Sequence, residues 1–193
     1  RVLYESMARS SLEAAGSTGL TPLVGREQEM GFLLERWAQV REGAGQVVLL
    51  SGEAGIGKSR LVQVLQEHVA AEPQAWLTPC QCSPYHQHTP LYPVIDFWER
   101  RLHVPGDDTP AAKGQRLEAT LADAGVSLQD TVPLLAALLS LPLPAEQYPS
   151  LQLTPQQQRH KTLETIGAIL CTLAAHQPVL LVLEDLHWVD PST

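Results

Sequence analysis

Two kinds of apolar pattern alternate along this chain. Residues 46–51 and 178–185 are short, nearly unbroken runs of β-branched and leucine residues. Such a run is typical of a strand buried on both faces, as in a parallel sheet. A further strand is expected at 75–80. Elsewhere apolar residues recur at three- and four-residue spacing, which predicts amphipathic helices. The helices are expected at 27–41, 60–69, 91–102, 111–124, 132–140 and 155–176.

The residues between the first run and the helix after it follow the pattern G-x-x-x-x-G-K-S. They are Gly52, Glu53, Ala54, Gly55, Ile56, Gly57, Lys58 and Ser59. Glycines let a backbone wrap closely around phosphate, and the following helix N-terminus aims free N–H groups at it. In such a loop Lys58 reaches the β- and γ-phosphates, and the Ser59 hydroxyl binds Mg²⁺. The alternative is a glycine turn that merely enters a helix. We expect a nucleoside triphosphate and Mg²⁺ here.

The second apolar run ends in two carboxylates, Glu184 and Asp185. Acids at the carboxyl end of a parallel strand lie at the ligand-binding edge of an α/β sheet. Glu184 is expected to hold the Mg²⁺ shell and Asp185 to activate the attacking water, although the two roles could be exchanged. The alternative is an acid that only starts a turn. Together with the phosphate loop, the pair predicts hydrolysis of the triphosphate.

Composition narrows the class of protein. The 193 residues carry a formal net charge of −8, with 44% hydrophobic and 18% charged residues. The composition is that of a globular protein, and the acidic balance argues against a broad nucleic-acid surface. The longest apolar stretch, around 132–143, is too short for a membrane span. The three cysteines make no disulfide framework, so a reducing, cytoplasmic setting is expected.

Several other polar residues have two interpretations. Cys80, Cys82, His86 and His88 form C-x-C-x3-H-x-H, which zinc could use, but the spacing is tighter than in common zinc modules. We therefore expect a polar loop without stoichiometric metal. His187 is a candidate γ-phosphate sensor or a turn residue, and Trp188 is expected to pack. Arg60 is expected to pair structurally; Arg159 and Lys161 are expected on a solvated helix face.

These motifs closely resemble the Orc-like AAA/STAND P-loop ATPase module of bacterial signalling proteins. The resemblance is carried by residues 24–27, 52–59 and 181–193. It implies a three-layer α/β P-loop NTPase fold, a parallel sheet flanked by helices. It also implies a helical insertion between the second strand and the acidic strand. By this resemblance the nucleotide is ATP, and Val24, Gly25 and Arg26 are candidate adenine or ribose contacts.

The resemblance also suggests a domain organisation. Residues 82–93 look like the version of the module found behind class III adenylate or guanylate cyclase domains, often followed by helical repeats. Residues 1–19 resemble the linker from such an upstream domain. Residues 20–193 would then be the N-terminal part of the ATPase domain, truncated after the acidic (Walker B) strand. We expect a fragment of a longer protein, with a strand encoded beyond Thr193.

The leading hypothesis is a regulatory ATPase module in a larger signalling protein, whose nucleotide state switches the domain arrangement. Its partners would be ATP, Mg²⁺, other domains of the same polypeptide and possible copies of itself, with no membrane. One alternative is an ATP-binding scaffold without turnover. Another is a DNA-associated AAA ATPase, which the acidic balance disfavours.

Overall fold

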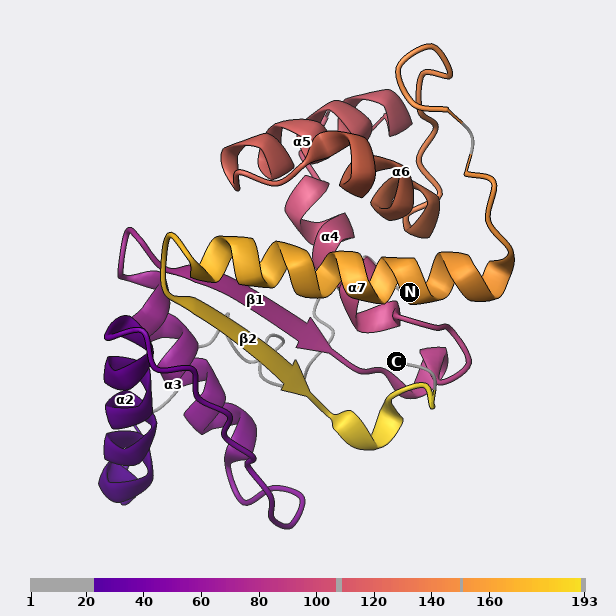
Figure 1. Ribbon diagram of the computed structural model, residues 1–193. Helices are drawn as coiled ribbons and strands as arrows, with labels where there is room; N and C mark the ends of the chain where they lie inside the picture. Colours follow the sequence, from indigo (N-terminus) through magenta and orange to yellow (C-terminus); the bar gives the residue numbers. More distant parts are fainter. Residues whose placement is uncertain (1–22, 107–108, 150, 192–193) are drawn as a thin grey trace. The chain divides into compact units, whose positions relative to one another are not determined.

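A computed structural model describes residues 23–106, 109–149 and 151–191 of the chain (Figure 1). It is a mixed α/β structure that divides into two compact units, residues 1–73 and 74–193. The segment 1–19, expected to be a linker, lies outside the described residues. In the part of the chain that is described, no helix has the length and apolar character needed to cross a membrane.

The first unit is built on a pair of helices. Helix α2, Glu27–Arg41, and helix α3, Lys58–Ala70, pack against each other. Helix α2 is predicted to the residue, whereas α3 begins two residues before the predicted start of 60. A hydrogen bond from Trp37 Nε1 to Glu72 Oε1 at 3.0 Å also joins α2 to the segment that follows α3. The buried residues of the two helices are Leu33, Trp37, Leu61, Leu65 and Val69.

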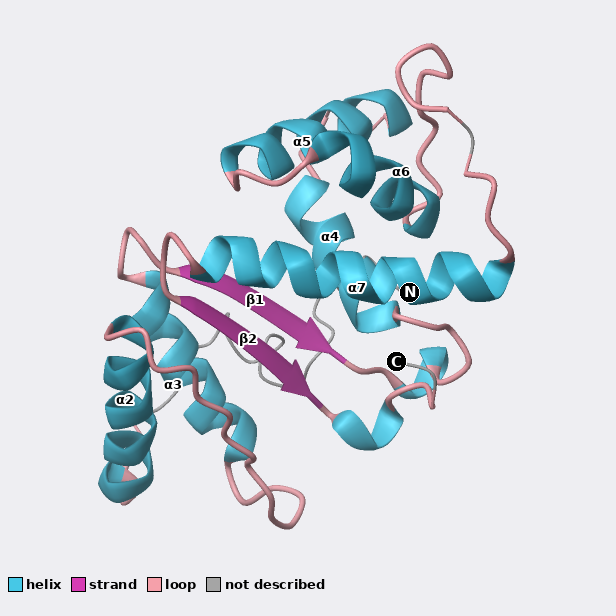
Figure 2. Ribbon diagram, viewed as in Figure 1, coloured by secondary structure: helices cyan, strands magenta, loops and turns pink. Residues whose placement is uncertain are grey.

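The strand predicted at 46–51 is not formed. Figure 2 shows this segment, which links α2 to α3, as a loop. Among the described residues, none of its backbone groups pairs with a second strand, and a strand requires such a partner. Val47 and Leu49 remain 99% and 77% exposed. The apolar pattern was that of a buried strand, and the prediction is wrong because the described part of the first unit contains no second strand with which the segment could pair.

The second unit contains a small parallel sheet. Strands β1, Trp76–Gln81, and β2, Val179–Glu184, pair in parallel, from Trp76 opposite Val179 to Gln81 opposite Glu184. Both strands were predicted within one residue at each end. The carboxyl ends of β1 and β2 therefore meet at one edge, where the acidic pair lies.

Strand β1 is protected along its other edge. The N–H of Trp76 bonds to Pro178 O and that of Cys82 to Glu184 O, so even-numbered residues of β1 face β2. Pro79 thus faces the opposite edge, where it has no N–H to offer. Its carbonyl accepts a hydrogen bond from Arg100 Nη2 at 2.9 Å. These two features remove one donor and one acceptor from this side of the sheet.

Helices fill the interval between β1 and β2, as predicted. They are α4, Tyr92–Leu102; α5, Pro110–Asp123; α6, Leu128–Leu138; and α7, Pro155–Ala174. Helix α6 begins four residues before the predicted start of 132, because Pro133 lies inside the helix rather than before it. A proline removes only one backbone donor, and burial of the surrounding apolar residues outweighs that loss.

The core of the second unit lies among these helices. Helix α4 packs on β1, α7 packs on β2 and on α6, and α5 packs on α6 (Figure 1). The most deeply buried side chains of this core are Leu102, Leu117, Leu121, Val132, Leu135 and Leu173. Four helices and both strands contribute to one apolar cluster. The strands that carry the acidic pair are therefore packed against a dense core.

Candidate functional site

The phosphate-loop motif lies in the first unit, immediately before α3. Gly55 and Gly57 have φ angles of +80° and +98°, a region that side-chain-bearing residues rarely adopt. Gly57 is also the N-cap of α3, with no side chain capping the helix. The Leu61 N–H bonds to Gly57 O, so the N–H groups of the first turn before it have no partner within the helix. These donors and the helix dipole favour an anion.

Lys58 is folded back over this loop. Its Nζ donates to Gly52 O at 2.8 Å and to Glu53 O at 2.9 Å. Ser59 follows it in the first turn of α3 and is half-buried. Held by the two carbonyls, the ammonium is positioned over the loop, and no acidic side chain of the described residues pairs with it. It can exchange these carbonyls for phosphate oxygens when an anion enters.

The segment before α2 contacts the same loop. Arg26 Nη2 donates to Ile56 O at 2.8 Å, and Arg26 Nη1 pairs with Glu29 Oε1 at 2.6 Å. The hydrogen bond from Arg26 lowers the pKa of the Glu29 carboxyl, which keeps that partner ionised. Gly25 has a φ of +73° and donates its N–H to Glu27 Oε1 at 3.1 Å. Val24 is 82% exposed.

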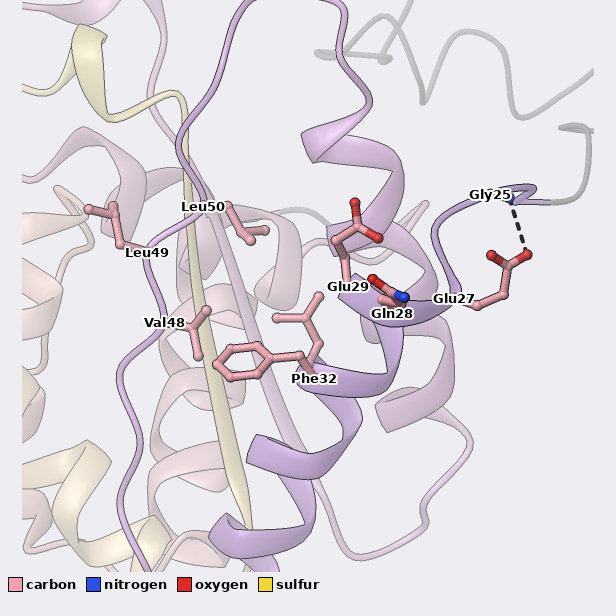
Figure 3. A pocket seen from close by; sticks show the side chains of 9 residues that line it. Gly25, Glu27, Gln28, Glu29, Phe32, Val48, Leu49 and Leu50 are labelled. Atoms are coloured by element: carbon pink, nitrogen blue, oxygen red, sulfur yellow. Dashed lines mark hydrogen bonds between the residues drawn. The ribbon is translucent and has the colours of Figure 1, made fainter.

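An open cleft of about 630 Å³ adjoins this segment, between the first half of α2 and the residues leading into the phosphate loop (Figure 3). One wall is the apolar 48–50 segment. The other wall is the first half of α2, which contributes Phe32 and Leu33 and, at its start, polar and acidic residues. The cleft is lined by Gly25, Glu27, Gln28, Glu29, Phe32, Leu33, Val48, Leu49 and Leu50. A flat ring with hydrogen-bond donors on its edge suits these two walls.

The acidic pair lies in the second unit at the end of β2. Glu184 is the last residue of β2 and is half-buried, and its carbonyl accepts the Cys82 N–H at 3.0 Å. Asp185 has a φ of +57°, a left-handed conformation that turns the chain out of the strand. Its Oδ2 accepts a hydrogen bond from Gln81 Nε2 at 3.3 Å. The parallel pairing brings these residues together at the sheet edge.

The cysteine–histidine segment is divided between core and loop. Burial raises the pKa of the Cys80 thiol to about 11. Burial, followed by the nearby Asp185 charge, also raises the pKa of Cys82, so both thiols stay protonated at neutral pH. The His86 ring stacks on Tyr92 with centroids 3.7 Å apart. Across the described residues, no three His, Cys, Asp or Glu side chains are grouped to hold a metal ion.

The remaining polar residues take mostly structural contacts. His187 and Trp188 form a short turn after Asp185, with ring centroids 4.7 Å apart. Arg60 pairs along its own helix, with Gln63 Oε1 at 3.1 Å and Glu67 Oε1 at 3.9 Å, as expected. Arg159 and Lys161 are exposed on α7. Gln81 is a residue that the sequence reading missed. The rule that parallel strands meet at their carboxyl ends would have pointed to it.

A glycine loop that enters a helix N-terminus through a Lys-Ser pair defines the class of P-loop nucleotide-binding proteins. Comparison with known families agrees with this class: the family model described as AAA ATPase domain matches residues 22–193. The chain belongs to the AAA ATPase domain family. An AAA ATPase domain binds ATP, and the family generally uses ATP with Mg²⁺.

A similar curated protein is an uncharacterized protein of Rhizobium meliloti (strain 1021). The two are 29% identical over 176 residues, which is 89% of this chain and 16% of that protein. The chain thus spans less than a fifth of the length of this relative. No solved structure matches the chain.

Proposed function

We propose that this chain is an ATP-binding and ATP-hydrolysing regulatory module of a larger signalling protein. The observation that carries the proposal is the phosphate loop. Lys58 is held over two loop carbonyls, next to the N–H groups at the start of α3, which have no partner within the helix. Family membership supports ATP as the nucleotide. The full three-layer arrangement of a P-loop NTPase is part of the same proposal.

The loop fits a polyphosphate by its donors and by its shape. A Cβ atom added at Gly52 would lie 3.3 Å from Ile56 Cγ2, so a side chain there would crowd the loop. The N–H groups, the Lys58 ammonium and the Ser59 hydroxyl are a donor set suited to phosphate oxygens and Mg²⁺. Mg²⁺, when bound, neutralises charge on the phosphates. Lys58 and the backbone amides would orient the ligand, and the Ser59 hydroxyl would hold the metal.

The acidic pair supplies the proposed chemistry. Glu184 would complete the Mg²⁺ shell, and Asp185 would accept the proton of the attacking water. The hydrogen bond from Gln81 fixes the orientation of the Asp185 carboxylate. A carboxylate held in this way is available for proton transfer without a further side-chain rearrangement.

We assign the nucleotide base to the cleft beside α2. Gly25 lines this cleft, and Phe32 offers an apolar face. The carboxylates of Glu27 and Glu29 can accept hydrogen bonds from an exocyclic amino group, as adenine has. The 82% exposure of Val24 leaves it free to close over the ring. Arg26 is a weaker base contact because its guanidinium is committed to Ile56 and Glu29.

The regulatory role follows from the resemblance to modules of multidomain bacterial regulators, including those linked to nucleotide cyclases. Partner domains in the same polypeptide, or further copies of the module, would respond to the nucleotide state. An ATP-binding scaffold without turnover is the second candidate. Phosphate release by the full-length protein separates the two. Turnover supports the first, and tight binding without phosphate release supports the second.

The binding proposal is tested by Lys58→Ala. Loss of a charge-assisted phosphate contact should lower the affinity for ATP at least about tenfold, since such a bond contributes roughly 1.5–3 kcal/mol. Affinity is measured by calorimetric titration of ATP with Mg²⁺. The matched control is Lys161→Ala on the exposed face of α7, for which affinity should not change. Unchanged affinity in a folded Lys58→Ala protein would exclude the assignment of the phosphate loop.

A further inference from the structure

Arg26 connects the segment before α2 to the middle of the phosphate loop. Its two terminal nitrogens have different partners: Nη1 pairs with Glu29 Oε1 at 2.6 Å, and Nη2 donates to Ile56 O at 2.8 Å. The side chain is 33% exposed, so the guanidinium makes both contacts while it stays partly open to solvent. The Glu29 carboxylate balances its charge. What Arg26 contributes to the loop is therefore a fixed hydrogen bond rather than an additional free cation.

The Ile56 carbonyl shares a planar peptide unit with the Gly57 N–H. Within the described residues the peptides are trans, and in a trans peptide the C=O and the N–H point to opposite sides. Holding the oxygen toward Arg26 therefore turns the Gly57 N–H away from Arg26. Glycine adopts either sign of φ at little cost, so without a restraint this peptide can reverse. Arg26 supplies the restraint.

The Gly57 N–H lies where an anion would bind. Gly57 is the N-cap of α3, and the N–H groups of the first helical turn, which have no partner within the helix, follow it directly. When the Gly57 N–H points in the same direction as the N–H groups of the first turn of α3, it adds a donor to the anion site. A reversed peptide would instead present the Ile56 carbonyl oxygen to the phosphate. The orientation of one peptide thus decides whether the loop attracts or repels the ligand at this position.

We propose that Arg26 is a positioning residue of the phosphate loop, which holds the Ile56–Gly57 peptide so that the Gly57 N–H is directed at the bound phosphate. This inference rests on the proposed function of ATP binding. It differs from a base or ribose contact in one measurable respect. A residue that positions the loop affects any polyphosphate, whereas a residue that reads the base or ribose affects only the nucleotide.

The test compares ATP with inorganic tripolyphosphate, both with Mg²⁺, by calorimetric titration of the whole chain. Arg26→Gln should weaken both ligands by the same factor, about tenfold, as expected for loss of one hydrogen bond to a charged group. Arg26→Lys should retain more affinity for both ligands than Arg26→Gln does. An ammonium can bond to Ile56 O or to Glu29, but it lacks the two separate nitrogens with which Arg26 bonds to both. Arg41→Gln, at the opposite end of α2, is the matched control and should change neither affinity.

A second measurement follows the peptide itself. In the ligand-free Arg26→Gln protein, the Gly57 amide should show NMR relaxation dispersion that the parent lacks, with an unchanged thermal unfolding midpoint. If Arg26→Gln does not fold, Arg26→Lys carries the comparison. Equal losses for the two ligands then support the inference.

Three results would overturn the inference. A loss for ATP alone would make Arg26 a base or ribose contact. Unchanged affinity for both ligands in folded Arg26→Gln would show that the Ile56 contact does not position the loop. If the parent protein binds neither ligand, the proposed function itself falls, and the role of Arg26 falls with it.

Discussion

Two charged side chains of the candidate site, Lys58 and Asp185, are held by uncharged groups. Lys58 is bonded to the Gly52 and Glu53 carbonyls, and Asp185 accepts from the Gln81 amide. An ammonium or carboxylate held in this way keeps its full charge for a ligand, because no charged partner among the described residues has to be displaced first. Each can thus act on phosphate, metal or water without breaking a salt bridge.

At the residue scale we predict different effects of the two acids on turnover and on binding. Asp185→Asn should lower the rate of ATP hydrolysis by the full-length protein about a hundredfold, the typical loss for a general base. Its ATP affinity should change less than about threefold. Glu184→Gln should also lower the rate, and it should raise the Mg²⁺ concentration needed for half-maximal activity.

Steady-state phosphate release measured at several Mg²⁺ concentrations checks both variants. Glu146→Gln, in the exposed segment before α7, is the matched control and should hydrolyse ATP at the parent rate. If Glu184→Gln and Asp185→Asn both retain the parent rate, the acidic strand end is structural.

At the scale of elements, helix starts are set by the residues at the N-cap and in the first turn. Helix α7 starts at a capping box: Gln157 N donates to Thr154 Oγ1 at 3.3 Å, and Thr154 N donates to Gln157 Oε1 at 3.0 Å. Pro155 occupies the first helical position, where its missing N–H costs nothing. Such signals are local in the sequence, so they predict a helix start without any knowledge of packing.

We predict that Thr154→Ala lowers the free energy of unfolding by about 1 kcal/mol, because an N-cap hydroxyl satisfies an otherwise unpaired N–H of the first turn. Thr154→Ser retains the hydroxyl and should stay within about 0.5 kcal/mol of the parent. Urea unfolding followed by circular dichroism measures both. Equal losses for the alanine and serine variants would show that the threonine methyl, and not the cap, stabilises the start of α7.

At the scale of the whole molecule, the candidate site residues are distributed over two compact units. The phosphate loop, the Arg26 contact and the cleft belong to the first unit, and the acidic pair belongs to the second. The larger core lies in the second unit, where helices α4 to α7 pack with the two strands, one of which ends in the acidic pair. The stability of that edge therefore depends on helix packing in the second unit rather than on ligand contacts.

We predict that Leu135→Ala, in the middle of α6, lowers the free energy of unfolding by about 2–5 kcal/mol, since the side chain is fully buried and leaves a cavity. The matched control is Leu151→Ala. Leu151 is 36% exposed and its removal should cost about 1 kcal/mol or less. Chemical denaturation measures both. A loss for Leu135→Ala as small as that of the control would mean that α6 is not part of the cooperative core.

The sequence by itself determined the helices, the two paired strands and the phosphate-loop motif. Their signals are local: apolar spacing for α2, a glycine-lysine-serine pattern for residues 52–59, and an unbroken apolar run for β2. The strand predicted at 46–51 failed for the opposite reason. Strand formation depends on a hydrogen-bonded neighbour, which an apolar pattern implies but does not supply.

Only the tertiary structure decided which residues meet. The sequence singled out Arg26 through a family motif, but its bond to Ile56 depends on how the start of α2 lies against the phosphate loop. Gln81 reaches Asp185 because β1 and β2 pair in parallel and in one register, across 104 positions of sequence. Contacts over such separations follow from packing and register, and no local pattern encodes them.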